Sequence, residues 1–158
     1  MNRRFLALVL LPTVFLSGCF LVVAVSPSSA DANIVIIGRW SGTTYDSAGS
    51  AAGVWALTQN GAALSGTTQI NDSTRNLAGD GTIRGTVNGK SISFHMEVPA
   101  GGFAGAMAPC SLVIDGAGTL ADDGSKITGS YTGSLAGTIG PQRSCGGTLS
   151  RGTFSMAR

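Results

Sequence analysis

The feature that most constrains the fold is a two-residue alternation of apolar and polar side chains. It is clearest over Ser91–Val98, where every second position is apolar: Ile92, Phe94, Met96 and Val98. An α-helix repeats every 3.6 residues, so no helix buries such a pattern on one face. We therefore expect this segment to be a β-strand with one buried face.

Similar alternation recurs along the chain in short segments separated by glycine-rich turns. Asn60-Gly61 and Asn88-Gly89 are strong hairpin signals, because both residue types tolerate positive φ. The 24 glycines of the 158 residues do not follow a collagen triplet, and no helix-forming run is present. The pattern predicts an all-β protein: an antiparallel up-and-down barrel of about eight strands. Glycines on the inward faces suit a tightly coiled wall, or leave room for a neighbour or a ligand.

The sequence also predicts several connections between the strands. Residues 34–37 are expected to lead into the first strand, and Asn71–Asp80 is expected to be a polar connection. A Gly/Ala-rich loop over Pro99–Pro109 is expected to expose Phe103 and Met107. A second glycine-rich loop is expected to run to Cys145, and a change of parity between Leu149 and Phe154 predicts a bulge near Gly152.

The first 30 residues have the character of an export signal. Two arginines precede a long apolar stretch, and three fates remain open for it. Small residues suit cleavage after Ala30 or Ala32, Leu16–Cys19 resembles a bacterial lipobox that would acylate Cys19, and the length suits a retained anchor. Each fate places residues 31–158, expected as a single barrel domain, in the periplasm or outside the cell, with membrane contact only through the N-terminal segment.

Two cysteines, Cys110 and Cys145, remain beyond the export signal. An oxidising compartment favours a disulfide between them over two separate thiols. Strands that are not neighbours lie about 9.5 Å apart, which exceeds the reach of a disulfide. The bridge is therefore expected at the loop ends of the barrel and not in its wall.

Gly38-Arg39-Trp40 in the first strand and an arginine that ends the last strand resemble the calycin barrels, the lipocalins and avidins. In lipocalins this tryptophan packs under the arginine, so the resemblance implies a contact between Trp40 and Arg158, with Arg151 as a substitute. Leu64–Thr67 is also similar to bacterial avidins. Avidins surround biotin with several tryptophans and this chain has two, so the resemblance does not extend to biotin binding.

Composition and motifs give little sign of catalysis. The charges are scattered without a run of one sign, which does not favour nucleic-acid binding. His95, the single histidine, is expected on the outer face, and Asp122-Asp123-Gly124 is expected to be a turn and not a calcium site. We therefore expect no catalytic residues, no metal and no cofactor. An enzyme ranks third among the functions considered, and a pocket that unites Tyr131 with an inward carboxylate would reopen that option.

The favoured function is a monomeric, non-enzymatic barrel that binds a small hydrophobic ligand at its open end. The residues expected to contact that ligand are the large inward side chains: Trp40, Trp55, Phe94, Met96, Tyr131 and Phe154. The alternative is a filled barrel that serves as an envelope structural or protein-interaction module, for instance an inhibitor that acts through the loop Pro99–Pro109.

Overall fold

The computed structural model describes residues 34–47, 49–73, 77–141 and 143–158. It contains ten strands and one short 3₁₀ helix: β1 (Gly38–Asp46), β2 (Gly49–Asn60), β3 (Ala63–Asp72), β4 (Leu77–Asn88), β5 (Ser91–Val98), η1 (Gly105–Met107), β6 (Ser111–Leu120), β7 (Lys126–Ala136), β8 (Thr138–Ile139), β9 (Arg143–Ser144) and β10 (Thr148–Ala157). The proposed cleavage sites after Ala30 and Ala32 and the lipidation site Cys19 lie outside the described residues. No helix in the described ranges is long and apolar enough to cross a membrane.

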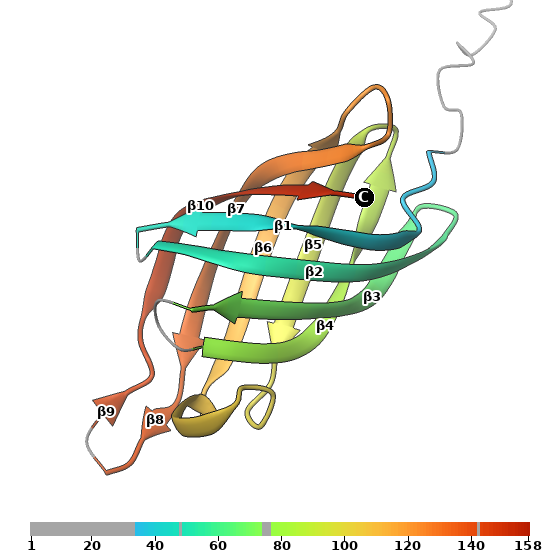
Figure 1. The fold of residues 1–158 in the computed structure, drawn as a ribbon. Coiled ribbons are helices and arrows are strands. Elements are labelled where there is room, and N and C mark those ends of the chain that lie inside the picture. The colour runs from blue at the N-terminus through green and yellow to red at the C-terminus, as the bar shows by residue number, and fades with distance from the viewer. Residues whose placement is uncertain (1–33, 48, 74–76, 142) are drawn as a thin grey trace, which may run out of the picture.

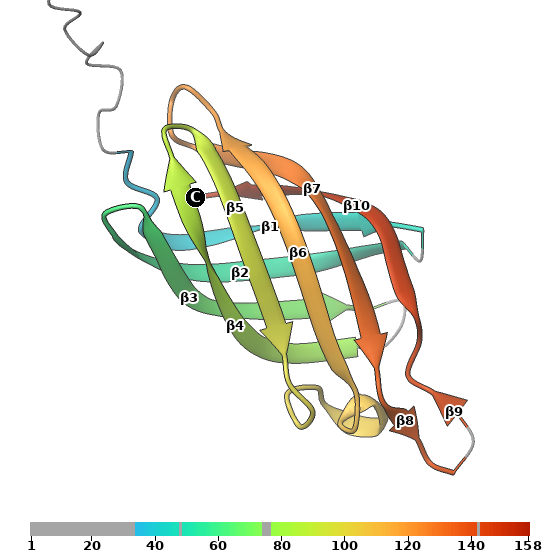
Figure 2. The same cartoon turned by 180° about the vertical axis from the view of Figure 1, so that it is seen from behind.

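Eight of the strands close into an antiparallel barrel in the order β1-β10-β7-β6-β5-β4-β3-β2 (Figures 1 and 2). Strands β1 to β7 pair in chain order, and β10 closes the barrel by pairing with both β7 and β1. The closing pair runs from Ser41 opposite Ala157 to Tyr45 opposite Thr153. The predicted fold is therefore confirmed, including the meeting of the first and last strands.

One end of the barrel, here called the closed end, is sealed by residues 34–37. These residues lie outside the strands, and Ile36 is fully buried. The side chain of Gln59 holds them, accepting a hydrogen bond from the Ile36 amide at 3.0 Å and donating one to the Ile34 carbonyl at 2.9 Å. The sequence predicted only that residues 34–37 precede β1. In the structure these residues also plug the closed end of the barrel.

Trp40 is the second part of the closed end. It is fully buried, and its indole Nε1 donates a hydrogen bond to the Ile36 carbonyl at 2.9 Å. The Arg158 guanidinium lies 4.7 Å from the centre of the Trp40 ring and donates to the Val35 carbonyl at 2.8 Å. A guanidinium over an indole face is a favourable cation–π arrangement. The contact that the calycin resemblance implied is thus confirmed, with Arg158 and not Arg151 as the partner.

The opposite end, here called the mouth end, differs from the sequence predictions in two places. The predicted connection Asn71–Asp80 was wrong: β3 continues to Asp72 and β4 begins at Leu77, because Leu77 and Gly79 keep the inward parity of the strand. The predicted exposure of Phe103 was also wrong, since this side chain is only 3% exposed.

The burial of Phe103 has a clear structural cause. Beyond the end of β5, its loop continues alongside β4, with Asp80 N donating to Gly102 O and Ala104 N donating to Ala78 O, both at 2.9 Å. Phe103 pairs there with Gly79, and its ring occupies the space that a side chain at position 79 would fill. Met107 is partly buried, so the loop does not present the apolar pair that the sequence suggested.

The predicted disulfide is confirmed and joins two connections at the mouth end. Cys110 and Cys145 have a Cα–Cα separation of 5.7 Å. Cys110 directly precedes β6, and Cys145 follows a small hairpin of β8 and β9 that the sequence predicted only as a loop. In Figure 1 this hairpin projects beyond the barrel at the end away from the C-terminus. The bridge therefore lies outside the barrel wall, as strand spacing requires.

Inward glycines allow the barrel interior to fill with aromatic rings. Each of three aromatic residues lies directly opposite a glycine on the neighbouring strand: Phe94 opposite Gly116, Phe154 opposite Gly129 and Tyr131 opposite Gly152. A Cβ added to any of these glycines would come within 2.7 Å of ring carbons of that aromatic residue. The glycines therefore leave room for a neighbour, which was one of the two roles expected for them.

We expect Gly116→Ala to lower the free energy of unfolding by about 1–3 kcal/mol, the usual range for overpacking a filled core. The added Cβ would lie 2.3 Å from Cζ of Phe94. Gly147→Ala is the matched control, because its Cβ would meet nothing within 4 Å. Urea unfolding should place the control within about 0.5 kcal/mol of the wild type. Equal effects of the two substitutions would contradict the packing described for Gly116.

Replacing both Cys110 and Cys145 with serine should lower the free energy of unfolding by about 2–5 kcal/mol. The bridge spans 35 residues, so its loss returns considerable freedom to the unfolded chain. Urea unfolding of the double variant, compared with the oxidised wild type, measures the effect. An unchanged midpoint would show that the disulfide does not constrain the chain.

Candidate functional site

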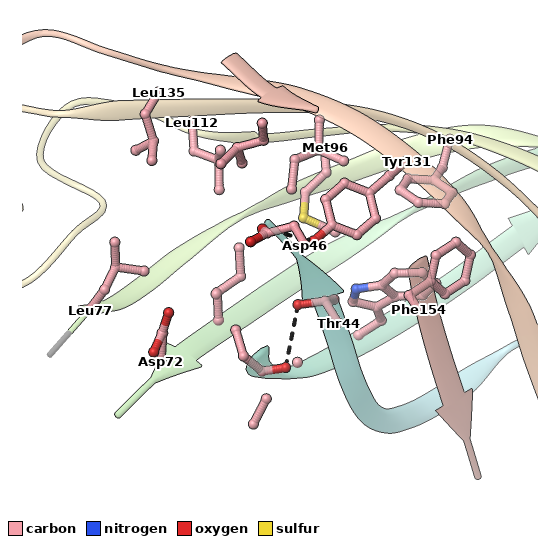
Figure 3. A pocket seen from close by; sticks show the side chains of 17 residues that line it. Thr44, Asp46, Asp72, Leu77, Phe94, Met96, Leu112, Tyr131, Leu135 and Phe154 are labelled. Atoms are coloured by element: carbon pink, nitrogen blue, oxygen red, sulfur yellow. Dashed lines mark hydrogen bonds between the residues drawn. The ribbon is translucent and has the colours of Figure 1, made fainter. Parts of the chain in front are cut away.

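An apolar cavity of about 50 Å³ lies inside the barrel toward the mouth end (Figure 3). It is lined by residues from all eight barrel strands: Thr44, Asp46, Ala51, Ala52, Gly53, Trp55, Ile70, Asp72, Leu77, Phe94, Met96, Leu112, Ile114, Tyr131, Leu135, Leu149 and Phe154. The barrel is thus filled at its closed end and partly hollow at the other.

The inner wall of the cavity is an aromatic cluster. The ring centre of Trp55 lies 5.1 Å from that of Phe94 and 5.3 Å from that of Phe154. The two phenylalanine rings are 5.4 Å apart and nearly perpendicular. Tilted and edge-to-face arrangements at these separations are favourable for aromatic rings. The cluster therefore forms a stable apolar wall on the inner side of the cavity.

Five of the six residues expected to contact a ligand line this cavity: Trp55, Phe94, Met96, Tyr131 and Phe154. Trp40 does not line it, because this residue belongs to the closed end under Arg158. The prediction that Trp40 points into the barrel was correct, but the two-residue alternation alone does not show at which end of the barrel a residue lies.

Aliphatic side chains border the cavity toward the mouth end, among them Leu77, Leu112, Leu135 and Leu149. Leu135 and Leu149 are only partly buried and flank the connection that carries Cys145. Leu112 lies two residues after Cys110. The disulfide thus joins the segments that hold three of these leucines, and it helps to fix one side of the mouth.

A tyrosine and a carboxylate meet inside the barrel. The Tyr131 hydroxyl donates a hydrogen bond to Oδ2 of Asp46 at 3.1 Å. The two residues belong to β7 and β1, which are separated by β10. The ring of Tyr131 crosses β10 over Gly152, where an added Cβ would lie 2.0 Å from its Cζ. The absence of a side chain at position 152 is what lets the hydroxyl reach β1.

The predicted bulge lies at this crossing. The pairing of β10 with β7 shifts between Leu149 and Gly152, and Arg151 has a φ of +37°, the only positive value among the described non-glycine residues. Such conformations cost about 1–3 kcal/mol and persist where the surrounding structure imposes them. The bulge brings Gly152 under the Tyr131 ring, so the strain is linked to the position of the tyrosine.

The carboxylates of the cavity wall were not predicted from the sequence. Asp46 begins a run of turn-forming residues, Asp46–Ser50, and Asp72 falls within the predicted connection Asn71–Asp80. Both nevertheless lie at strand ends with inward parity, and Asp72 is only 1% exposed. The signal was present in the alternation itself, since Asp46 follows Trp40, Gly42 and Thr44 at two-residue steps. Polar residues at strand ends resemble turn residues, and this obscured the pattern.

The other titratable residues considered in the sequence lie away from the cavity. His95 is on the outer wall, where its Nδ1 lies 2.8 Å from Oδ1 of Asp115. Asp123 is in the predicted turn, and hydrogen bonds from the backbone and side chain of Ser125 lower the pKa of its carboxyl group. Within the described residues, no three His, Cys, Asp or Glu side chains are grouped as metal ligands would be.

Comparisons with protein-family models, curated proteins and solved structures give no match to this chain. The eight-stranded antiparallel barrel is compatible with a calycin-like fold.

We expect Tyr131→Phe to lower the free energy of unfolding by about 1–2 kcal/mol, because it removes a hydrogen bond to a carboxylate. In a Gly152→Ala background the same substitution should have almost no further effect, since the displaced ring no longer reaches Asp46. Urea unfolding of the four proteins in this double-mutant cycle measures the coupling. If Tyr131→Phe has the same effect in both backgrounds, Gly152 does not position the tyrosine.

Proposed function

We propose that this protein is an exported, monomeric, calycin-like barrel that binds a small hydrophobic ligand at its mouth end without catalysing a reaction. The observation that carries the proposal is the apolar cavity, which lies toward the end opposite the plug formed by Ile36 and Trp40. An eight-stranded barrel has an interior that side chains can fill or that holds one small ligand. In this barrel, side chains fill the interior at the closed end but leave a cavity toward the mouth end.

The size of the cavity limits the ligand. Its 50 Å³ is about a third of the volume of an engineered apolar cavity that accepts benzene. A ligand of six or more carbon atoms therefore requires the partly buried Leu135 and Leu149 to move outward. Side chains at the rim can do so more easily than the packed aromatic cluster, so we place entry between these leucines.

The disulfide supports export, because such bonds persist in oxidising compartments. Cleavage after Ala30 or Ala32 and lipidation at Cys19 both remain proposals. The described chain begins at the closed end, where Arg158 contacts Val35. An anchor attached through the N-terminal segment would thus join the protein at the end away from the mouth.

One observation favours an enzyme as a second candidate. Tyr131 and the inward carboxylate of Asp46 are hydrogen-bonded at the cavity, and this is the pairing that reopens the option of an enzyme. A phenol and a carboxylate can transfer protons to and from a bound molecule. The test is incubation of each ligand that binds with the protein, followed by mass spectrometry. A new product that disappears with Asp46→Asn would establish the enzyme.

The interaction-module alternative has lost the observation that motivated it, because Phe103 is buried against Gly79.

Tryptophan fluorescence tests ligand binding directly. In the Trp40→Phe variant, Trp55 is the single remaining tryptophan and it lines the cavity. We expect a saturable change in its emission when small aromatic ligands or medium-chain fatty acids are titrated. The absence of a saturable response to every compound would count against the proposed function.

Substitution at the rim should then separate binding in the cavity from binding elsewhere. We expect Leu135→Phe to weaken the affinity about tenfold or more, because a larger side chain obstructs the mouth, an effect worth about 1.4 kcal/mol. Ser134→Phe is the matched control, since Ser134 lies on the exposed face of the same strand. Isothermal titration calorimetry measures both. Equal affinities of the two variants would place the ligand outside the cavity.

A further inference from the structure

Trp55 carries an indole N–H that has no hydrogen-bond partner among the described residues. The side chain is only 3% exposed, and buried tryptophans usually pair this group. The other tryptophan shows the ordinary arrangement, since Nε1 of Trp40 donates to the Ile36 carbonyl at 2.9 Å. The indole of Trp55 is therefore the exception.

The Trp55 N–H must reach the cavity. Among the described residues, the only side-chain polar atom that is both fully enclosed and without a hydrogen-bond partner is Oγ1 of Thr68. Because Nε1 of Trp55 has no partner and is not that atom, it cannot be fully enclosed. It must therefore border accessible space. Trp55 has an inward position on β2 and lines the cavity, so the cavity is that space.

The other polar groups of the wall are of a different kind. The Tyr131 hydroxyl already donates to Asp46, and the Thr44 hydroxyl makes a long contact of 3.4 Å to the Ala51 carbonyl. Two carboxylates, Asp46 and Asp72, also line the cavity. Burying a charge in an apolar cavity is costly, so an anionic ligand is disfavoured there.

We propose that the ligand carries an uncharged oxygen that accepts a hydrogen bond from the indole N–H of Trp55, as in a small apolar ketone or alcohol. The inference rests on the proposed function and specifies the ligand class for the same cavity. A hydrocarbon of the same shape leaves the donor unpaired, and burial of an unpaired donor is unfavourable. A carboxylate of the same shape brings a negative charge into the apolar cavity, where burial of a charge is unfavourable.

Three probes of one ring size test the proposal: cyclohexanone, cyclohexane and cyclohexanecarboxylate. The wild type should bind the ketone about 2- to 10-fold more tightly than the hydrocarbon, which corresponds to one net hydrogen bond, and should bind the carboxylate least. Trp55→Phe keeps an aromatic ring but removes the donor, so the preference for the ketone should disappear. Trp40→Phe, which alters the closed end, should keep the preference.

Nuclear magnetic resonance supplies a readout that a merely structural role would not affect. The chain has two tryptophans, so a ¹H–¹⁵N spectrum contains two indole signals, which the Trp40→Phe variant assigns. Cyclohexanone should shift the Trp55 indole proton downfield and leave that of Trp40 in place. The hydrocarbon should not produce this downfield shift.

The outcomes separate the two proposals. If no probe binds and the other ligand series also fails, the proposed function itself is wrong. If the ketone and the hydrocarbon bind equally and the Trp55 indole signal stays in place, the cavity binds ligands but the inferred hydrogen bond is wrong. A wild-type preference for the carboxylate would also overturn the inference.

Discussion

The packing of aromatic rings across glycines determines how the interior of this barrel is occupied. An aromatic ring can lie across the neighbouring strand only where the facing residue has no side chain in its way, because interiors are close-packed. Here Phe94, Phe154 and Tyr131 each face a glycine, so each ring extends over the opposing strand toward the centre. The first two rings meet Trp55 there, and the third reaches Asp46. The solid core and the polar pair at the cavity thus have the same cause.

The two ends of the barrel are built from different interactions, so the two ends of the interior are filled to different extents. Ile36, held by Gln59, and Trp40, covered by Arg158, close one end with apolar volume and a cation–π contact. At the other end the connections are joined by a disulfide while leucines on their flanks remain partly buried. For the ligand that we propose, this arrangement favours entry at the mouth end, where Leu135 and Leu149 are only partly buried.

Local periodicity predicted the barrel wall well, because Ser91–Val98 and similar segments can bury their apolar faces only as strands. The meeting of the first and last strands was predicted from Gly38-Arg39-Trp40 and the C-terminal arginine, which together resemble the calycin barrels. Periodicity was weaker at strand ends: the polar run before Leu77 concealed the start of β4, and the bridge between Phe103 and Gly79 depends on residues 24 positions apart. The contact of Tyr131 with Asp46 was also beyond local pattern, since it requires barrel closure, a bulge and Gly152 together.

The proton chemical shifts of the glycines test the central claim most directly. An α-proton that points at the face of an aromatic ring is moved upfield by the ring current. If the rings lie as described, one α-proton of each of Gly116, Gly129 and Gly152 resonates well upfield of ordinary strand glycines, and the shift at Gly116 disappears in Phe94→Leu. Ordinary α-proton shifts at all three glycines would contradict the account, because the rings would then not cover them.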